Sequence, residues 1–129
     1  MAYVNLTKEN FEEVITNNDT VVVDYWAEWC GPCKSFGPIF EKVSEDFPEA
    51  VFAKVDTENE QEIASYFQIR SIPTLMIFRE KVIVFSQPGA LPEGALRDVV
   101  TKAGNLDMVE VHKQVAHQQA EQEKQAPTA

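Results

Sequence analysis

The 129-residue chain is organised around the stretch Trp29-Cys30-Gly31-Pro32-Cys33, which contains its only two cysteines. Two intervening residues leave the thiols close enough along the chain to form an intramolecular disulfide. If a helix begins at this motif, its free amide groups and its dipole favour the thiolate of the first cysteine. The stretch therefore predicts a redox-active pair in which Cys30 is the nucleophile.

Three other uses of this spacing compete with a redox pair. A zinc site needs two further ligands, and the candidates His112 and His117 lie far downstream in a polar tail. A c-type haem requires a histidine directly after the second cysteine, where this chain has Lys34. Two inert structural thiols are the simplest alternative, although Trp, Gly and Pro are unusual neighbours for core cysteines.

The segments on either side of the motif predict a buried strand that leads into a helix. Residues 21–26 form an apolar, β-branched and aromatic run that is interrupted only by Asp24, which is typical of a strand buried on both faces. Reactive residues at the C-terminal end of such a strand match the usual position of sites in these sheets. After Cys33, apolar residues recur at helical spacing at Phe36, Ile39, Phe40, Val43 and Phe47.

The rest of the chain predicts further helices and strands around this pair. Parallel strands come first and an antiparallel hairpin comes last, so we expect an α/β fold with a central mixed β-sheet flanked by helices on both faces. The expected elements are a helix capped by Thr7, a strand over 51–56, a short helix opened by an Asn59/Glu62 capping box, a hairpin of strands 74–78 and 82–85, and a helix from Pro92 to Gly104.

Length and charge restrict the classes of function. A chain of 129 residues is one domain in size and can bury a core without help from a disulfide or a metal. Its net charge of −10 disfavours nucleic acid and anionic membranes as partners. Neither a signal peptide nor an apolar run near the length of a membrane span is visible. We therefore expect a cytoplasmic protein, in a compartment where a Cys-x-x-Cys pair is more often catalytic than structural.

Several segments resemble the thioredoxin family, over a region from about Leu6 to Ala103. Residues 21–34 are similar to the family's active-site segment nearly residue for residue. The segment Ser71-Ile72-Pro73-Thr74-Leu75 resembles its cis-proline loop, and Pro88-Gly89-Ala90-Leu91 resembles its Gly-Ala segment. Residues 35–37, residues 79–81 and the tail depart from the family pattern. The resemblance implies the thioredoxin fold.

The resemblance also implies a thiol-disulfide oxidoreductase that reduces protein disulfides. Cys30, expected to be exposed, would attack a client disulfide, and the more buried Cys33 would then release the reduced client. Gly31 and Pro32 between the cysteines are similar to those of reducing members. The implied chain binds no cofactor and no metal, and a separate flavin-dependent thioredoxin reductase recharges its redox-active disulfide. Disulfide-containing client proteins and that reductase are the expected partners of a monomer.

Three residues outside the motif have implied catalytic roles. A carboxylate of Asp24 buried behind Cys33 would have a raised pKa and could take that thiol's proton through water. Lys54 matches the family's buried lysine near this carboxylate, and Pro73 matches its cis-proline. The apolar run around Asp24 favours this buried position over the alternative of a solvent-facing residue at a strand end. Taken without the resemblance, Lys54 would more often be a surface residue.

An apolar surface around the sulfurs is the implied client-binding site. A cis Pro73 would set the backbone of Ile72 beside the cysteines, where it could pair with an extended substrate. Trp29, Ile72, Gly89 and Ala90 would surround the sulfurs with a flat surface that suits many clients. Trp26 is equally well explained by core packing.

The composition changes after Gly104, so we expect a thioredoxin domain over residues 1–104 and a polar extension over 105–129 that is partly helical and then disordered. Asp107 and Glu110 form a capping box, and Met108, Val111 and Val115 form a narrow apolar stripe. So narrow a stripe favours a surface helix docked by its first two turns. A helix for dimerisation or for a partner is the alternative. We expect His112 and His117 to be solvated.

A second class of function uses the same residues differently. The chain could be a thioredoxin-fold binding module or co-chaperone that holds clients on its apolar surface, with the cysteines as a redox sensor. A Cys33→Ser variant separates the two, because only a reductase would accumulate mixed disulfides on Cys30.

Overall fold

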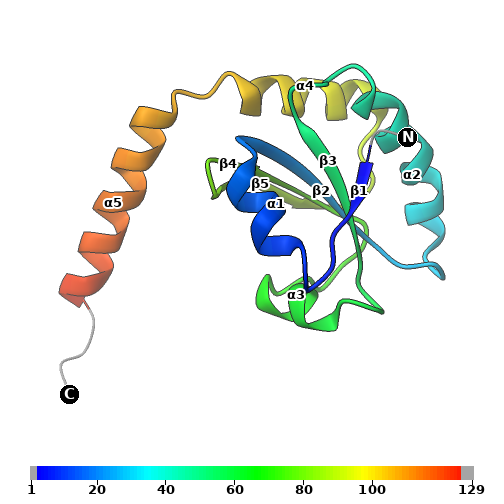
Figure 1. Cartoon of the computed structure of the whole chain (residues 1–129), viewed down its shortest axis with the longest axis horizontal. Coiled ribbons are helices and arrows are strands. Elements are labelled where there is room, and N and C mark those ends of the chain that lie inside the picture. The colour runs from blue at the N-terminus through cyan, green and yellow to red at the C-terminus, as the bar shows by residue number, and fades with distance from the viewer. Residues whose placement is uncertain (1–2, 126–129) are drawn as a thin grey trace.

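The protein folds as a five-stranded mixed sheet with helices on both faces (Figure 1). Its structure, a computed structural model, describes residues 3–125. Across the sheet the order is β1-β3-β2-β4-β5, with β1, β3 and β2 parallel and with β4 antiparallel to both of its neighbours. The predicted α/β fold class is confirmed. The elements in chain order are β1 (Tyr3–Asn5), α1 (Phe11–Asn17), β2 (Thr20–Trp26), α2 (Gly31–Ser44), β3 (Val51–Asp56), α3 (Gln61–Tyr66), β4 (Thr74–Arg79), β5 (Val82–Pro88), α4 (Glu93–Gly104) and α5 (Met108–Gln125).

The central strand β2 is buried on both of its faces, as its apolar run predicts. Val21, Val22 and Val23 are fully buried. Because alternate side chains of a strand point to opposite faces, Val22 packs in the core under α2 and α4, whereas Val21 and Val23 pack in the core under α1 and α3. The strand is therefore held between two apolar layers, and it ends just before the cysteine motif.

The helix α2 begins directly after Cys30, which is its N-cap residue. Pro32 lies in the first turn, where its missing N–H removes no helical hydrogen bond. Phe36, Phe40 and Val43 are fully buried and form the predicted apolar face. The cysteine motif thus lies at a junction between a buried strand and a helix that is anchored along its inner face.

β1 is a strand that the sequence analysis did not predict. It contains three residues at the edge of the sheet and pairs in parallel with β3. So short a segment has no hydrophobic period to detect. The register sets Tyr3 opposite Phe52 and Asn5 opposite Lys54. As a result, the Tyr3 side chain packs on the face of the sheet that α2 and α4 cover.

The helix α1 begins later than the sequence analysis predicts. Thr7 caps a turn rather than the helix itself, because the Thr7 amide donates to Asn10 Oδ1 at 2.7 Å and the Asn10 amide approaches Thr7 Oγ1 at 3.4 Å. The α-helix then starts at Phe11, and it ends at Asn17 where the polar cluster predicts.

The predicted Asn59/Glu62 capping box is wrong. The side chain of Asn59 donates to Asp56 Oδ2 at 2.9 Å, and the other oxygen of this carboxylate accepts the backbone amide of Glu58 at 3.0 Å. The helix α3 starts only at Gln61 and has no side-chain cap. Asp56, at the end of β3, therefore accepts the hydrogen bonds of the loop, and the Asn59 side chain binds Asp56 instead of capping α3. Short polar side chains often form such local hydrogen bonds outside helices.

The strands β4 and β5 extend beyond the predicted 74–78 and 82–85, and a two-residue turn joins them. Glu80 and Lys81 in this turn have φ angles of 49° and 71°. Positive φ at both positions normally favours Gly or Asn, so the turn could not be assigned from the sequence. The backbone amide of Glu80 donates to the carbonyl oxygen of Asp19 at 2.8 Å. A contact with the segment before β2 therefore supports the turn.

The C-terminal helix α5 extends away from the body of the molecule (Figure 1). Asp107 Oδ1 accepts the backbone amides of Val109 and Glu110 at 3.1 and 3.3 Å, which confirms the Asp107 half of the predicted capping box. Met108 is buried, whereas most of the helix is exposed. His112 and His117 are exposed, as expected, and His112 Nε2 also lies 2.8 Å from Glu80 Oε1 in the β4–β5 turn. The predicted end of the tail, residues 126–129, lies outside the described residues.

We propose that residues 1–104 form the stable domain and that the extension adds little to it. A chain that ends at Gly104 should lose only about 2 kcal/mol of unfolding free energy, since Met108 is the main buried side chain of α5. Urea denaturation of the two chains measures this difference, and Met108→Ala in the full chain should reproduce most of it. Non-cooperative unfolding of the shorter chain would contradict the boundary.

Candidate functional site

Cys30 and Cys33 form a disulfide at the junction of β2 and α2, with their Cα atoms 5.3 Å apart. The expectation that Cys30 is exposed and Cys33 more buried is wrong, because their exposed fractions are 3% and 4%. Trp26 and Ile72 pack against both cysteines together with the buried Ala27. Exposure therefore does not distinguish the two sulfurs in the disulfide form.

Hydrogen bonding and helix geometry do distinguish them. Cys30 is the N-cap of α2, and its Sγ accepts the backbone amide of Cys33 at 3.2 Å. The positive end of the helix dipole lies at this position, and an amide donor aimed at sulfur favours a thiolate there. Gly31 and Pro32 supply the first helical turn between the two cysteines. Helix geometry and the amide donor therefore distinguish Cys30 from Cys33 and favour a thiolate at Cys30.

The loop before β4 comes to the same place. The Ile72–Pro73 peptide bond is cis, as the resemblance implies. The carbonyl oxygen of Ile72 lies 3.7 Å from Cys30 Sγ. The backbone amide of Gly89 donates to the carbonyl oxygen of Pro73 at 2.7 Å. Gly89 has a φ of +102°, a conformation that side-chain-bearing residues rarely adopt, and Ala90 beside it is exposed. The cis-proline and Gly-Ala segments are thus brought together next to the disulfide.

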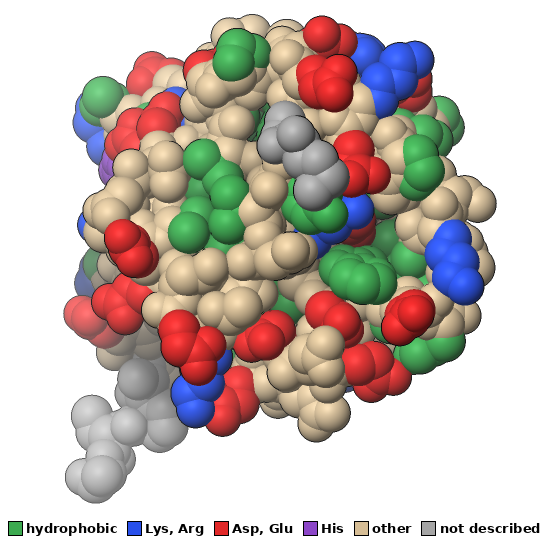
Figure 2. Space-filling model, turned by 45° about the vertical axis from the view of Figure 1, so that its right-hand side comes forward, with side chains coloured by type: hydrophobic (Ala, Val, Ile, Leu, Met, Phe, Trp, Pro, Cys, Tyr) green, Lys and Arg blue, Asp and Glu red, His purple; other side chains and the backbone are tan. Residues whose placement is uncertain are grey.

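Trp29 supplies an exposed apolar surface beside the cysteines. Its side chain is 69% exposed, which is unusual for so large an apolar group. Its indole Nε1 donates to Glu58 Oε1 at 2.6 Å, so the ring is held in place by the loop after β3. No local pattern in the sequence indicated this role of Glu58, because Glu58 and Trp29 are distant in the chain. Figure 2, which brings the α2 side forward, shows acidic side chains scattered between apolar ones.

Asp24 is a buried carboxylate in the middle of the sheet. Its exposed fraction is 1%, which rules out a solvent-facing position, and its Oδ1 has no hydrogen-bond partner within residues 3–125. Burial raises the pKa of this carboxyl from 3.8 to about 7, and the positive charge of Lys54 opposes part of that increase. A group with such a pKa can accept or release a proton near neutral pH.

Lys54 is the register partner of Asp24 on β3, but it is only half-buried. Its ammonium group lies over the ring of Tyr3, with Nζ 4.6 Å from the ring centroid. Lys54, Trp26 and Cys33 line a shared pocket of about 280 Å³. This pocket connects the second cysteine to the lysine that faces Asp24. Nothing in the sequence indicated β1, so Tyr3 could not be recognised as a neighbour of Lys54.

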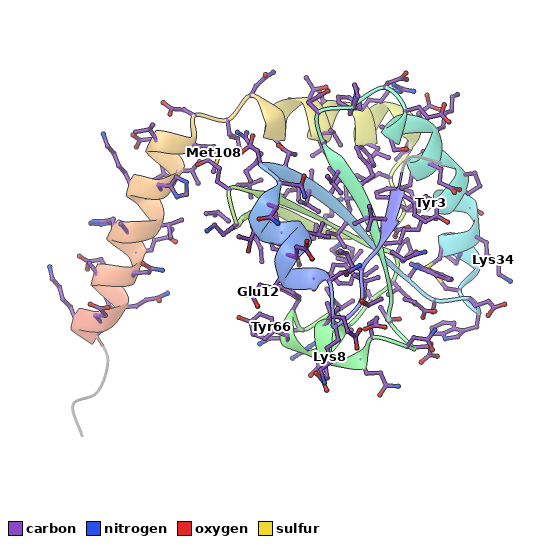
Figure 3. All side chains as sticks on the ribbon, in the orientation of Figure 1. Tyr3, Lys8, Glu12, Lys34, Tyr66 and Met108 are labelled. Carbon is purple, nitrogen blue, oxygen red and sulfur yellow. A yellow bond between two sulfur atoms is a disulfide. The ribbon has the colours of Figure 1, made fainter. Side chains whose placement is uncertain are left out.

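A second, apolar groove lies on the opposite face of the sheet. It is formed between α1 and α3 and includes Phe11, Ile15 and Phe67, with the labelled Lys8, Glu12 and Tyr66 at its rim (Figure 3). The groove contains no cysteine, and the sheet separates it from the face that α2 covers. Over residues 3–125, no group of three or more potential metal ligands gathers, and no helix is long and apolar enough to cross a membrane.

Comparisons with known proteins give a consistent result. The thioredoxin family model matches residues 2–102 of this chain. The Streptomyces coelicolor protein named "Putative thioredoxin 2" is 62% identical over 118 residues, which cover 92% of this chain and 88% of that protein. A thioredoxin of Mycoplasmoides gallisepticum is 40% identical and covers 72% and 93%, respectively. A mutant thioredoxin from Halobacterium salinarum superimposes with a TM-score of 0.74 at 32% identity, covering 80% of this chain and 91% of that structure.

The raised pKa of Asp24 predicts a pH-dependent cost in stability. Between pH 3.8 and about 7, the native state keeps a proton that the unfolded chain has released, so the unfolding free energy falls as pH rises through this window. Asp24→Asn, which cannot ionise, should therefore be more stable than the parent at pH 8 by on the order of 3 kcal/mol.

Denaturant unfolding at pH 4 and pH 8 tests this expectation. The difference should shrink toward zero at pH 4, where both side chains are neutral. Asp98→Asn, a change at an exposed carboxylate on α4, serves as the matched control and should not show this dependence. An Asp24→Asn protein that is equally or less stable at pH 8 would contradict the effect of burial.

Proposed function

Since the chain belongs to the thioredoxin family, we propose that Cys30 is the attacking nucleophile, Cys33 the resolving thiol and Asp24 the base that serves it. The protein is a thiol-disulfide oxidoreductase, a protein-disulfide reductase that works by dithiol-disulfide exchange through the Cys30/Cys33 pair. The observation that carries the assignment of roles is the Cys33 amide that donates to Cys30 Sγ at 3.2 Å, at the N-terminus of α2.

The first step joins the protein to its client. In the reduced protein, the Cys30 thiolate attacks one sulfur of a client disulfide, a Cys30–client disulfide forms, and the other client sulfur leaves as a thiolate that takes a proton from solvent. The amide of Cys33 and the positive end of the α2 dipole favour the thiolate of Cys30, which is the attacking form.

The second step releases the client. The Cys33 thiol passes its proton to the Asp24 carboxylate through water, and its sulfur attacks Cys30 Sγ. The bond between Cys30 and the client breaks, and the client sulfur leaves as a second thiolate. Two electrons have then moved to the client, and the protein carries the Cys30–Cys33 disulfide. The pKa of about 7 makes Asp24 suitable for this transfer, and Lys54 moderates that pKa by its charge.

Client binding is assigned to the surface around the disulfide. An extended client segment would pair with the backbone of Ile72 next to Pro73, in the manner of strand addition. Trp29, Gly89 and Ala90 would flank it. Two observations support this binding surface. The indole of Trp29 is exposed on one side of the disulfide, and the hydrogen bond from the Gly89 amide to the Pro73 carbonyl holds the other side in place.

The partners and the compartment follow from this chemistry. Each turnover leaves the disulfide form, which must be reduced again by a donor of two electrons. We infer that a separate flavin-dependent thioredoxin reductase supplies them, and that the protein is a monomer that works in the cytoplasm, where clients are kept reduced. No observation favours the alternative of a binding module or co-chaperone.

Reduction of insulin tests the reductase activity. Catalytic amounts of the protein should accelerate the reduction of insulin disulfides by dithiothreitol, measured as turbidity from the released B chain. Cys30→Ser should reduce this acceleration to the level of dithiothreitol alone, since it removes the nucleophile. Full acceleration by the Cys30→Ser variant would overturn the assigned roles.

Trapping of mixed disulfides separates the two cysteines. Cys33→Ser should accumulate covalent adducts between Cys30 and client proteins, because the resolving thiol is missing, and non-reducing electrophoresis followed by mass spectrometry detects them. The matched variant Cys30→Ser should accumulate few or none. Equal trapping by both variants would mean that the fold does not select Cys30.

A further inference from the structure

The contact between Tyr3 and Lys54 joins the edge of the sheet to the catalytic carboxylate. Lys54 Nζ lies 4.6 Å from the centroid of the Tyr3 ring, within the range of a cation–π interaction. The register explains the contact, because Tyr3 and Asn5 of β1 lie opposite Phe52 and Lys54 of β3. In Figure 3, Tyr3 lies on the α2 side of β1.

The register of β2 and β3 places Lys54 beside Asp24. Asp24 and Lys54 are partners in the parallel pair β2–β3, and side chains at partner positions point to the same face of the sheet. Tyr3 therefore approaches Lys54 from one side of β3 while Asp24 faces it from the other. Gly37 of α2 lies above them, and a Cβ at this position would come within 3.6 Å of Lys54 Nζ.

Lys54 has no salt bridge in the part of the chain that the structure describes. A lysine ammonium on a flexible four-carbon stem would otherwise turn toward solvent, which hydrates it strongly. The face of an aromatic ring attracts the ammonium electrostatically and offers a fixed position that water does not. The Tyr3 ring is the group that can keep the charge of Lys54 beside Asp24.

We propose that Tyr3 is a positioning residue for the reaction, because its ring holds the Lys54 ammonium beside the Asp24 carboxylate. The second cysteine shares the pocket that Lys54 lines, so the position of this charge matters where Cys33 must lose its proton. The expected effect of Tyr3 on the resolving step rests on the proposed role of Asp24 as the base. The expected effect of Tyr3 on the titration of Asp24 does not depend on that role.

Other groups also face this region and have to be considered in any titration. Lys54 and Tyr3 contact each other. Cys33 is a further titratable group, but it titrates only when the disulfide is reduced. The remaining charged groups near the pocket or on the same strand are Glu28, Lys34, Glu41 and Asp56. None of these four residues is substituted in the variants below. Because the measurement uses the disulfide form, Cys33 does not titrate in it.

The test is the titration of Asp24 in the disulfide form of the full chain, followed by NMR of a ¹³C-labelled carboxyl group. Tyr3→Leu removes the ring face and should raise the pKa of Asp24 by roughly half a pH unit, because the ammonium moves away into solvent. Tyr3→Phe keeps the ring face and should leave this pKa unchanged. Lys54→Met should raise it at least as much as Tyr3→Leu does.

The combined variant separates positioning from a general loosening of β1. If Tyr3 acts through Lys54, adding Tyr3→Leu to Lys54→Met should cause no additional change in the pKa of Asp24. An unchanged or lowered pKa in Tyr3→Leu, or an equal increase in the Lys54→Met background, would overturn the proposal.

Kinetics separate this inference from the proposed function. The pH profile of the resolving step should move upward in Tyr3→Leu by the same amount as the pKa of Asp24, while Tyr3→Phe keeps the parent profile. A shifted pKa with an unshifted profile would leave Tyr3 as the positioning residue and would remove Asp24 from the role of base.

Discussion

The burial of β2 is the constraint on which the site depends. Val21, Val22 and Val23 are packed between two apolar layers, so the end of this strand can hardly move relative to α2, whose inner face packs against the same core. Cys30 therefore stands at the N-terminus of α2 with a backbone amide aimed at its sulfur. A disulfide between residues three apart needs no large movement to open or close under these conditions, because the helix start holds both cysteines.

The same burial places a carboxylate where it costs stability. Asp24 lies on the central strand without a hydrogen-bond partner for Oδ1 among residues 3–125, and burial raises its pKa to about 7. A hydrophobic residue would satisfy the core better at this position. This cost in stability is consistent with a chemical reason for the carboxylate rather than a role in folding. A thiol that must lose its proton needs an acceptor that titrates near neutral pH.

Charge near this carboxylate is arranged from the edge of the sheet inward. Lys54 on β3 is the register partner of Asp24, and the Tyr3 ring on β1 lies against the Lys54 ammonium. The C-terminal helix α5 contacts the fold elsewhere, through the buried Met108 and the pair between His112 and Glu80. The disulfide site and the extension thus depend on different parts of the fold.

The sequence by itself determined the buried strand, the helix that follows it and the nature of the pair, because hydrophobic periodicity and the spacing of the cysteines are local properties. The apolar run around Asp24 indicated a buried carboxylate, whereas the resemblance supplied Lys54 and Pro73, since residue type alone favours a surface lysine and a trans proline. Only the tertiary structure decided that both cysteines are nearly equally buried, that Asp56 rather than Asn59 organises the turn before α3, and that Glu80 and Lys81 form a tight turn without glycine. It also placed Tyr3 over Lys54. Each of these outcomes depends on contacts between segments that are distant in the chain or on competition between neighbouring polar groups. A local sequence pattern encodes neither the distant contacts nor the result of that competition.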